Sequence, residues 1–127
     1  MRLGAWGWSL AVCAVLMSGS VLANNLSASL KNYYAEYEIV LECEEQKQLT
    51  EADGDAAEAA IDAIEAYYLK KDSSIDKDEL WDRAEADKDE GFRIMARSGG
   101  GLRPYCRQSL RELLTKAQEV GPVASGN

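Results

Sequence analysis

Arginines are the residues whose type and spacing most suggest chemistry. Arg103, Arg107 and Arg111 recur every four residues, and Arg97 precedes them across the stretch 97–106, RSGGGLRPYC. A guanidinium donates two parallel hydrogen bonds to a carboxylate or a phosphate, so a line of arginines can hold an anionic partner. Pairing with acidic faces of the same chain is the competing interpretation. We take these four arginines as the candidate partner-binding residues.

The charges are segregated along the chain. Residues 36–90 carry 20 acidic and six basic side chains, a balance of −14, whereas residues 91–127 carry six basic and two acidic ones, a balance of +4. A nucleic acid is not the expected partner, because the net charge of −8 opposes its phosphate backbone. We expect a protein partner instead.

The chain contains no histidine. A serine or cysteine nucleophile therefore has no imidazole base, and histidine-ligated haem and most zinc and copper sites are excluded. Carboxylates remain, and two of them about 5 to 10 Å apart in a cleft can hydrolyse a glycoside. A small helical bundle offers little cleft, so we expect no catalytic residue, no metal site and no cofactor.

Two acidic segments, residues 52–58 and 86–94, contain the alternating acids and glycine of a calcium loop. With Asp87 at the first position, Gly91 arrives one place early and Ser98 stands where a bidentate glutamate is needed. Both segments fit capped or exposed helix better. The glycine run 99–101 is no phosphate loop either, since the P-loop lysine and hydroxyl are absent.

The N-terminus has the pattern of an export signal. Arg2 precedes an apolar run over residues 10–17, and small residues follow up to Ala23. A retained membrane anchor is the alternative, but residues 18–20 interrupt the run before it reaches the roughly 20 apolar residues that a membrane-spanning helix needs. Cleavage after Ala23 leaves 104 residues with a net charge of −9. We expect a periplasmic or secreted protein without stable membrane insertion. The sequence does not predict its oligomeric state.

Removal of the signal leaves two cysteines, Cys43 and Cys106. Two cysteines in an exported chain suggest one disulfide, whereas two free buried thiols would suit the cytosol. A bond between residues so far apart in sequence stabilises the fold by about 4 kcal/mol in the chain-entropy account.

The spacing of apolar residues predicts four helices, over about 27–48, 50–71, 75–97 and 103–120. Thr50 is the expected cap of the second helix, but Gly54 could delay its start to residue 53 or 55. Ser74 is the expected cap of the third, whose polar middle is either exposed or broken near Gly91. The fourth carries Pro104 in its first turn and Leu114 in its apolar stripe.

Short connections make consecutive helices antiparallel, which predicts an all-α fold: a small up-down-up-down four-helix bundle with one disulfide. Cys43 near the end of the first helix and Cys106 near the start of the fourth then lie at similar depth. Residues 99–101 form a tight corner between the last two helices. The expected organisation is a signal peptide over 1–23, one helical domain over 24–120 and a disordered tail over 121–127.

Three functions stay open. The first is an exported, non-enzymatic helical protein that binds another envelope or secreted protein, as an inhibitor, an immunity or exclusion factor, or an accessory of a secretion machine. The second is an acid- or stress-responsive periplasmic chaperone that loosens as its carboxylates become neutral. The third, and weakest, is a carboxylate-based hydrolase of the cell wall.

Overall fold

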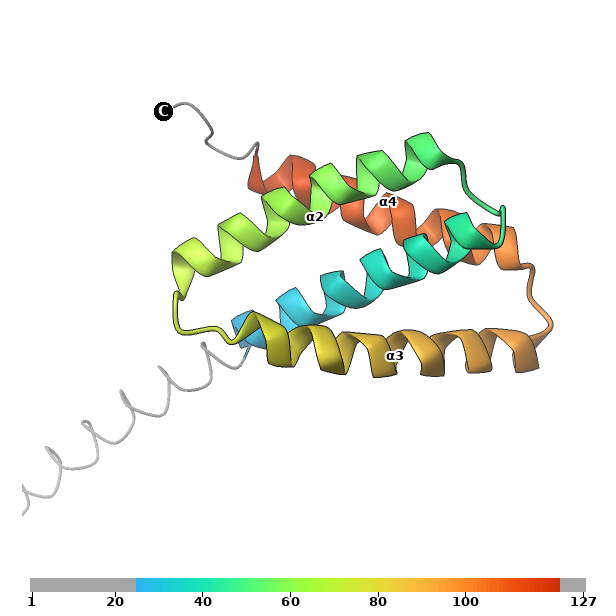
Figure 1. Cartoon of the computed structure of the whole chain (residues 1–127), viewed down its shortest axis with the longest axis horizontal. Helices are drawn as coiled ribbons and strands as arrows, with labels where there is room; N and C mark the ends of the chain where they lie inside the picture. The colour runs from blue at the N-terminus through green and yellow to red at the C-terminus, as the bar shows by residue number, and fades with distance from the viewer. Residues whose placement is uncertain (1–24, 122–127) are drawn as a thin grey trace, which may run out of the picture.

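The computed structural model describes residues 25–121. The predicted signal peptide and the tail from residue 122 on lie outside the described residues. A helix over residues 25–45, called the first helix below, is followed by α2 (Glu51–Lys71), α3 (Lys77–Ser98) and α4 (Leu102–Val120). Figure 1 shows that the first helix and α3 run in one direction and α2 and α4 in the other.

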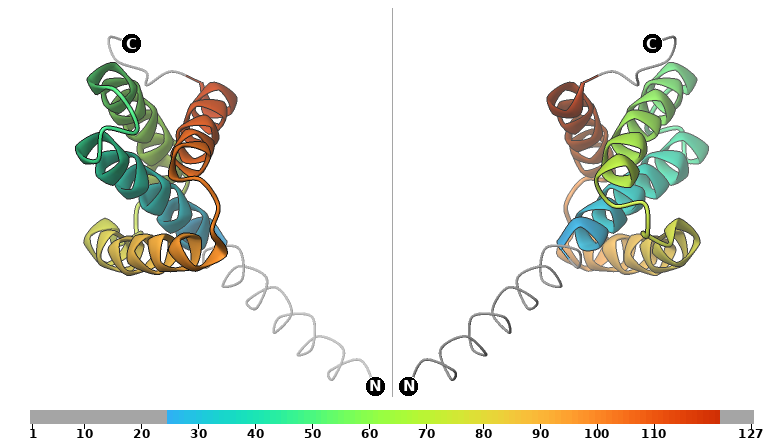
Figure 2. Two further views of the ribbon diagram at one scale, coloured as in Figure 1. Left: turned by 90° about the vertical axis from the view of Figure 1, so that its right-hand side faces the viewer. Right: turned by 90° about the vertical axis from the view of Figure 1, so that its left-hand side faces the viewer.

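The helices are stacked in layers. α2 and α4 pack side by side, the first helix lies across them, and α3 lies on the far side of the first helix (Figure 2). The predicted all-α arrangement of four packed helices is therefore confirmed. The first helix is the central one, because it contacts a layer on each of its sides.

The core forms where these layers meet. Its largest fully buried side chains come from the first helix, α2 and α4: Leu30, Tyr34, Val40, Cys43, Ile64, Cys106 and Leu113. α3 contributes only Leu80 and Ala84 as buried residues. Its Trp81 stacks on Tyr34 at 3.8 Å between ring centroids, and this contact joins α3 to the first helix.

The predicted disulfide between Cys43 and Cys106 is present, with 5.9 Å between the two Cα atoms. Both cysteines are fully buried. The bond therefore fixes the end of the first helix to the start of α4, as the depth argument predicted.

The start of α2 differs from one expectation. Thr50 Oγ1 accepts a hydrogen bond from the Asp53 amide at 3.1 Å, and Asp53 Oδ2 accepts one from the Thr50 amide at 3.0 Å. This reciprocal capping satisfies two backbone donors, so α2 begins at Glu51 and the delay expected from Gly54 is wrong. Gly54 is buried, and a Cβ atom there would clash with the carboxylate of Glu44.

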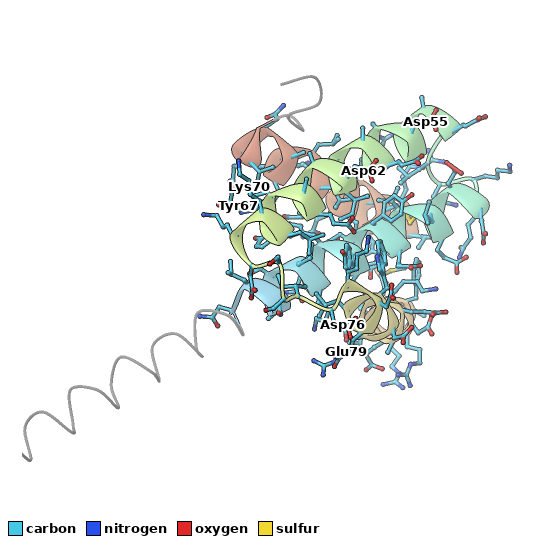
Figure 3. The ribbon with its side chains drawn as sticks, turned by 60° about the vertical axis from the view of Figure 1, so that its left-hand side comes forward. Asp55, Asp62, Tyr67, Lys70, Asp76 and Glu79 are labelled. Atoms are coloured by element: carbon cyan, nitrogen blue, oxygen red, sulfur yellow. A yellow bond between two sulfur atoms is a disulfide. The ribbon has the colours of Figure 1, made fainter. Side chains whose placement is uncertain are left out.

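The start of α3 corrects another expectation. Asp76, not Ser74, is the cap, and its carboxylate accepts from the Glu79 amide at 3.2 Å (Figure 3). Ser74 instead donates through its amide and its hydroxyl to Asp72 Oδ1, which completes the preceding turn. α3 does not break at Gly91, where the Tyr105 hydroxyl lies in the space that a side chain would need.

The glycine-rich corner has the predicted form. Gly99 ends α3 with a φ of 72°, a left-handed conformation in which a side chain is strained. Gly101 precedes α4, and Pro104 lies in its first turn. Among residues 25–121, no helix is both long enough and apolar enough to cross a membrane.

Candidate partner-binding surface

Helix α4 presents three of the four candidate arginines along one line. Its buried face consists of Cys106, Ser109, Leu110 and Leu113. Arg103, Arg107 and Arg111 are exposed beside that face, and successive members are about 6 Å apart along the helix axis. Arg97 is also exposed, but it lies in the last turn of α3, which the corner at residues 99–101 joins to α4. The structure thus places three of these arginines on one helix and Arg97 on its neighbour.

These arginines have no ion-pair partner in the described part of the chain. Arg83 and Arg93 on α3 pair with Glu79 and Glu90 one turn away. Within residues 25–121, none of the four candidate arginines has a carboxylate oxygen within 4.0 Å. The interpretation that they are neutralised by direct pairing inside the chain therefore finds no contact to support it. Their role as a partner-binding set stays a prediction.

Arg107 lies on the side of α4 that faces α2. The pKa of the Asp53 carboxyl on α2 is held below its ordinary value, mainly by the Thr50 amide that donates to it and less by the positive charge of Arg107. Arg107 is thus close enough to α2 to act on it through space without forming an ion pair.

An exposed apolar side chain shares a groove with two of these arginines. A shallow groove of about 260 Å³ is lined by Arg107, Leu110, Arg111, Leu114, Thr115 and Gln118. Leu114 is 36% exposed, and Ile94 on α3 is the only other exposed large apolar residue among residues 25–121. An exposed leucine bordered by arginines is typical of protein interfaces, in which an apolar centre is ringed by polar groups. We call Arg103, Arg107, Arg111 and Leu114 the arginine surface.

A larger hollow is acidic and lies elsewhere. It has a volume of about 720 Å³ and lies between the first helix and the N-terminal half of α2. Tyr37, Leu41 and Leu49 supply its apolar lining, and its carboxylates come from Glu44, Glu45, Glu51, Asp55 and Glu58. Asp55 and Asp62 follow one another along this acidic side of α2 (Figure 3). The hollow repels anions, so it does not suit the anionic partner that the arginines of α4 could hold.

Two carboxyl groups have a raised pKa, and neither lines that hollow. Burial between the first helix and α4 raises the pKa of Glu36, and the negative charge of Glu112 adds to the rise. The hydrogen bond that Ser109 donates to Glu36 lowers the pKa, but by less than burial raises it. Burial likewise raises the pKa of Glu38, against the charge of Lys88. A glycosidase needs a carboxylic acid of raised pKa inside its cleft. Here the raised carboxyls and the large hollow do not coincide.

A cluster of tyrosines holds the C-terminal half of α4 in place. The Lys116 ammonium lies 5.8 to 6.0 Å from the ring centroids of Tyr33, Tyr67 and Tyr68, which belong to the first helix and α2. It also pairs with Glu119 at 3.4 Å. Attraction between a cation and aromatic faces stabilises this corner and fixes the direction in which α4 presents the arginine surface.

Leu114 is the residue of this surface that sequence reasoning missed. The apolar stripe of the last helix includes it, yet the structure buries Leu113 and leaves Leu114 exposed. The signal that could have found it is its position three residues after Arg111, which places it on the same face as that arginine.

Comparisons with known proteins give no family to place beside this geometry. No family model, curated protein or solved structure matches the chain.

Proposed function

We propose that this protein is an exported, non-enzymatic helical module that binds an acidic envelope or secreted protein through its arginine surface. One observation carries the proposal. Arg107 and Arg111 border the exposed Leu114, and within the described residues neither has a carboxylate within ion-pairing distance. A surface that combines donors available for a carboxylate with an uncovered apolar side chain suits a partner that supplies both complements.

The compartment rests on two independent features. The buried Cys43–Cys106 disulfide is consistent with an oxidising compartment. The first 23 residues have the composition of a cleaved export signal. Together they support a periplasmic or secreted protein, whose partners are then other proteins of the envelope or of the secreted fraction.

Charge segregation gives the binding its direction. The chain carries a net charge of −8, so most of its surface repels an acidic protein. The basic residues of α4 form a local exception, and a partner that docks there pairs its carboxylates with guanidinium groups while the rest of the surface disfavours other orientations. Loss of both Arg107 and Arg111 should weaken binding by about 2 to 5 kcal/mol, as for charged hydrogen-bonded pairs at other interfaces.

Affinity capture tests this proposal. The mature chain, immobilised through a C-terminal tag, is exposed to envelope and secreted fractions of the producing cell, and retained proteins are identified by mass spectrometry. We expect wild type to retain a specific acidic protein that Arg107→Gln with Arg111→Gln does not retain. Arg83→Gln with Arg93→Gln is the matched control, because it removes two arginines of α3 that already have partners. Equal retention by all three proteins would refute the proposal.

The identity of the captured protein then assigns the role within the class. A lytic enzyme or toxin whose activity falls on binding would make this chain an inhibitor or immunity factor. A component of a secretion or conjugation machine would make it an accessory or exclusion factor.

A further inference from the structure

The outer face of the α2–α4 layer is covered by no described helix. The first helix packs on one side of this layer, and the opposite side is open (Figure 2). The groove that contains Leu114 belongs to α4, and Arg107 lies toward α2. The arginine surface therefore borders an open face to which α2 also contributes.

α2 supplies that face with a line of small residues. Its buried side consists mainly of Ala57, Ala60, Ile61, Ile64 and Tyr68. A second line of alanines recurs at helical spacing next to that side: Ala52, Ala56, Ala59, Ala63 and Ala66. All of them except Ala63 are exposed, so packing in the core does not account for these alanines.

Helix propensity alone does not explain why these exposed positions are alanine. Alanine is the best helix former, yet another exposed line of α2 carries carboxylates instead: Glu51, Asp55, Glu58 and Asp62. One exposed line of the same helix is thus charged and the other is apolar and smooth. Small side chains let a second helix axis approach closely, at the short end of the usual 8 to 10 Å.

The charges beside this smooth line define what can lie on it. The arginines of α4 follow one edge at intervals of four residues, and the carboxylates of α2 follow another. A helix that lies along the alanines meets positive charge on the α4 side and negative charge on the far side of α2. Carboxylates spaced by four residues on one edge of such a helix would face Arg103, Arg107 and Arg111 in turn.

We propose that the arginine surface recognises its partner through a single amphipathic α-helix, which lies along the alanine line of α2 with its acidic edge toward α4. The apolar stripe of that helix contacts Leu114 and the alanines. This inference rests on the proposed function and adds the form of the recognition element to it.

A synthetic peptide tests the inference directly. The probe is a fluorescent helical peptide of the length of α4, 19 residues, with a leucine stripe and three glutamates spaced by four residues along one edge. Its binding to the mature protein is followed by fluorescence anisotropy. We expect saturable binding that falls at least tenfold when two prolines are placed in the middle of the peptide, because proline breaks the helix.

Substitution of the alanines of α2 distinguishes docking of a helix against them from attraction by the arginine charges alone. Ala56→Trp with Ala59→Trp leaves every charge in place but obstructs close approach, so we expect at least a tenfold loss of peptide binding. Ala86→Trp on α3 is the matched control, since Ala86 is exposed and off this face, and it should bind as wild type does. Circular dichroism of each variant verifies the fold, and Ala59→Gln provides a smaller obstruction with the same expected direction.

Three results would overturn the inference: no binding of the helical peptide to wild type, equal binding of the proline peptide, or equal binding by the tryptophan variant. These outcomes are separable from failure of the proposed function. In one outcome, a captured partner fails to bind the Arg107→Gln, Arg111→Gln variant but still binds the tryptophan variant. That result would support binding through the arginine surface and refute recognition through a helix on the alanine line. A partner kept by both variants would refute both proposals.

Discussion

The Tyr34 hydroxyl donates a hydrogen bond of 2.6 Å to Glu65 Oε2, and thereby links the centre of the first helix to α2. The tyrosine ring is fully buried and stacks on Trp81 of α3. One side chain therefore joins three helices. Burial, together with this hydrogen bond to Glu65, raises the pKa of the Tyr34 hydroxyl well above its usual range, so it stays a donor at every physiological pH.

We predict that Tyr34→Phe lowers the free energy of unfolding by about 1 to 2 kcal/mol, because the ring packing is kept and one charge-assisted hydrogen bond is lost. Urea denaturation measures the change. Tyr37→Phe is the control, since Tyr37 packs edge-on against the same Trp81 and has no side-chain hydrogen bond among the described residues. An equal loss in both variants would show that the Glu65 contact contributes nothing.

The disulfide should contribute a large share of the stability. Replacement of Cys43 and Cys106 by alanine is expected to lower the free energy of unfolding by about 4 kcal/mol, because the unfolded chain gains the freedom of a loop of more than 60 residues. Guanidinium denaturation of the variant and of the oxidised protein gives the difference. Detection of two free thiols in the folded, exported protein would contradict this prediction.

The cap of α2 is a third test. Thr50→Ala removes the hydroxyl that accepts from the Asp53 amide and should cost about 1 kcal/mol of stability. Thr115→Ala on the exposed face of α4 is a control at a site without a capping role. Thermal unfolding that ranks the two variants equally would argue against the cap as the feature that fixes the start of α2.

Glu36 makes the stability depend on pH. Its pKa is raised by burial, so the charged carboxylate destabilises the fold above the folded-state pKa, and this cost disappears as the pH falls through that pKa. Glu36→Gln should therefore be more stable than wild type at pH 7, by a margin that shrinks toward pH 4. Denaturation at several pH values measures it, and a variant less stable than wild type at pH 7 would contradict the sign.

The raised pKa of Glu36 also bears on the acid-chaperone hypothesis. That hypothesis needs a fold that loosens as carboxylates become neutral, but protonation of Glu36 and Glu38 stabilises this fold. Asp53 acts the other way, since its pKa is lowered by the Thr50 amide, and its contribution is lost only as the pH falls below the ordinary range of a carboxyl group. Asp72 acts in the same direction as Asp53, since its hydrogen bonds with Ser74 lower its pKa. The carboxyl groups therefore act in opposite directions, and acid loosening stays a hypothesis beside binding through the arginine surface.

Sequence patterns predicted the elements of the fold better than their packing. Helical periodicity predicted four helices and short connections predicted their antiparallel arrangement, with which the positions of Cys43 and Cys106 agreed. The cap at Asp76 was missed because Ser74 and Asp76 are both good capping residues, and the competing hydrogen bonds of Ser74 to Asp72 appear only in three dimensions.

The layered packing was not predictable for a similar reason. α3 has a polar middle, and its place is shown only by contacts in three dimensions: Trp81 stacks on Tyr34 of the first helix, and Phe92 packs edge-on against Tyr105 of α4. The candidate arginines could be found by spacing. Which of them share a surface depends on how the helices pack. Leu114 has the spacing of a core residue, but in the structure it is exposed.

Site-specific photo-cross-linking tests the central claim most directly. A photoreactive phenylalanine analogue replaces Leu114 in the protein as it is exported by living cells, and Ile94, the other exposed large apolar residue of the described chain, is replaced in a parallel strain. We predict one discrete cross-linked protein from position 114, lost when Arg107 and Arg111 are changed to glutamine, and none from position 94. No adduct at position 114, or the same adducts at both positions, would contradict binding through the arginine surface.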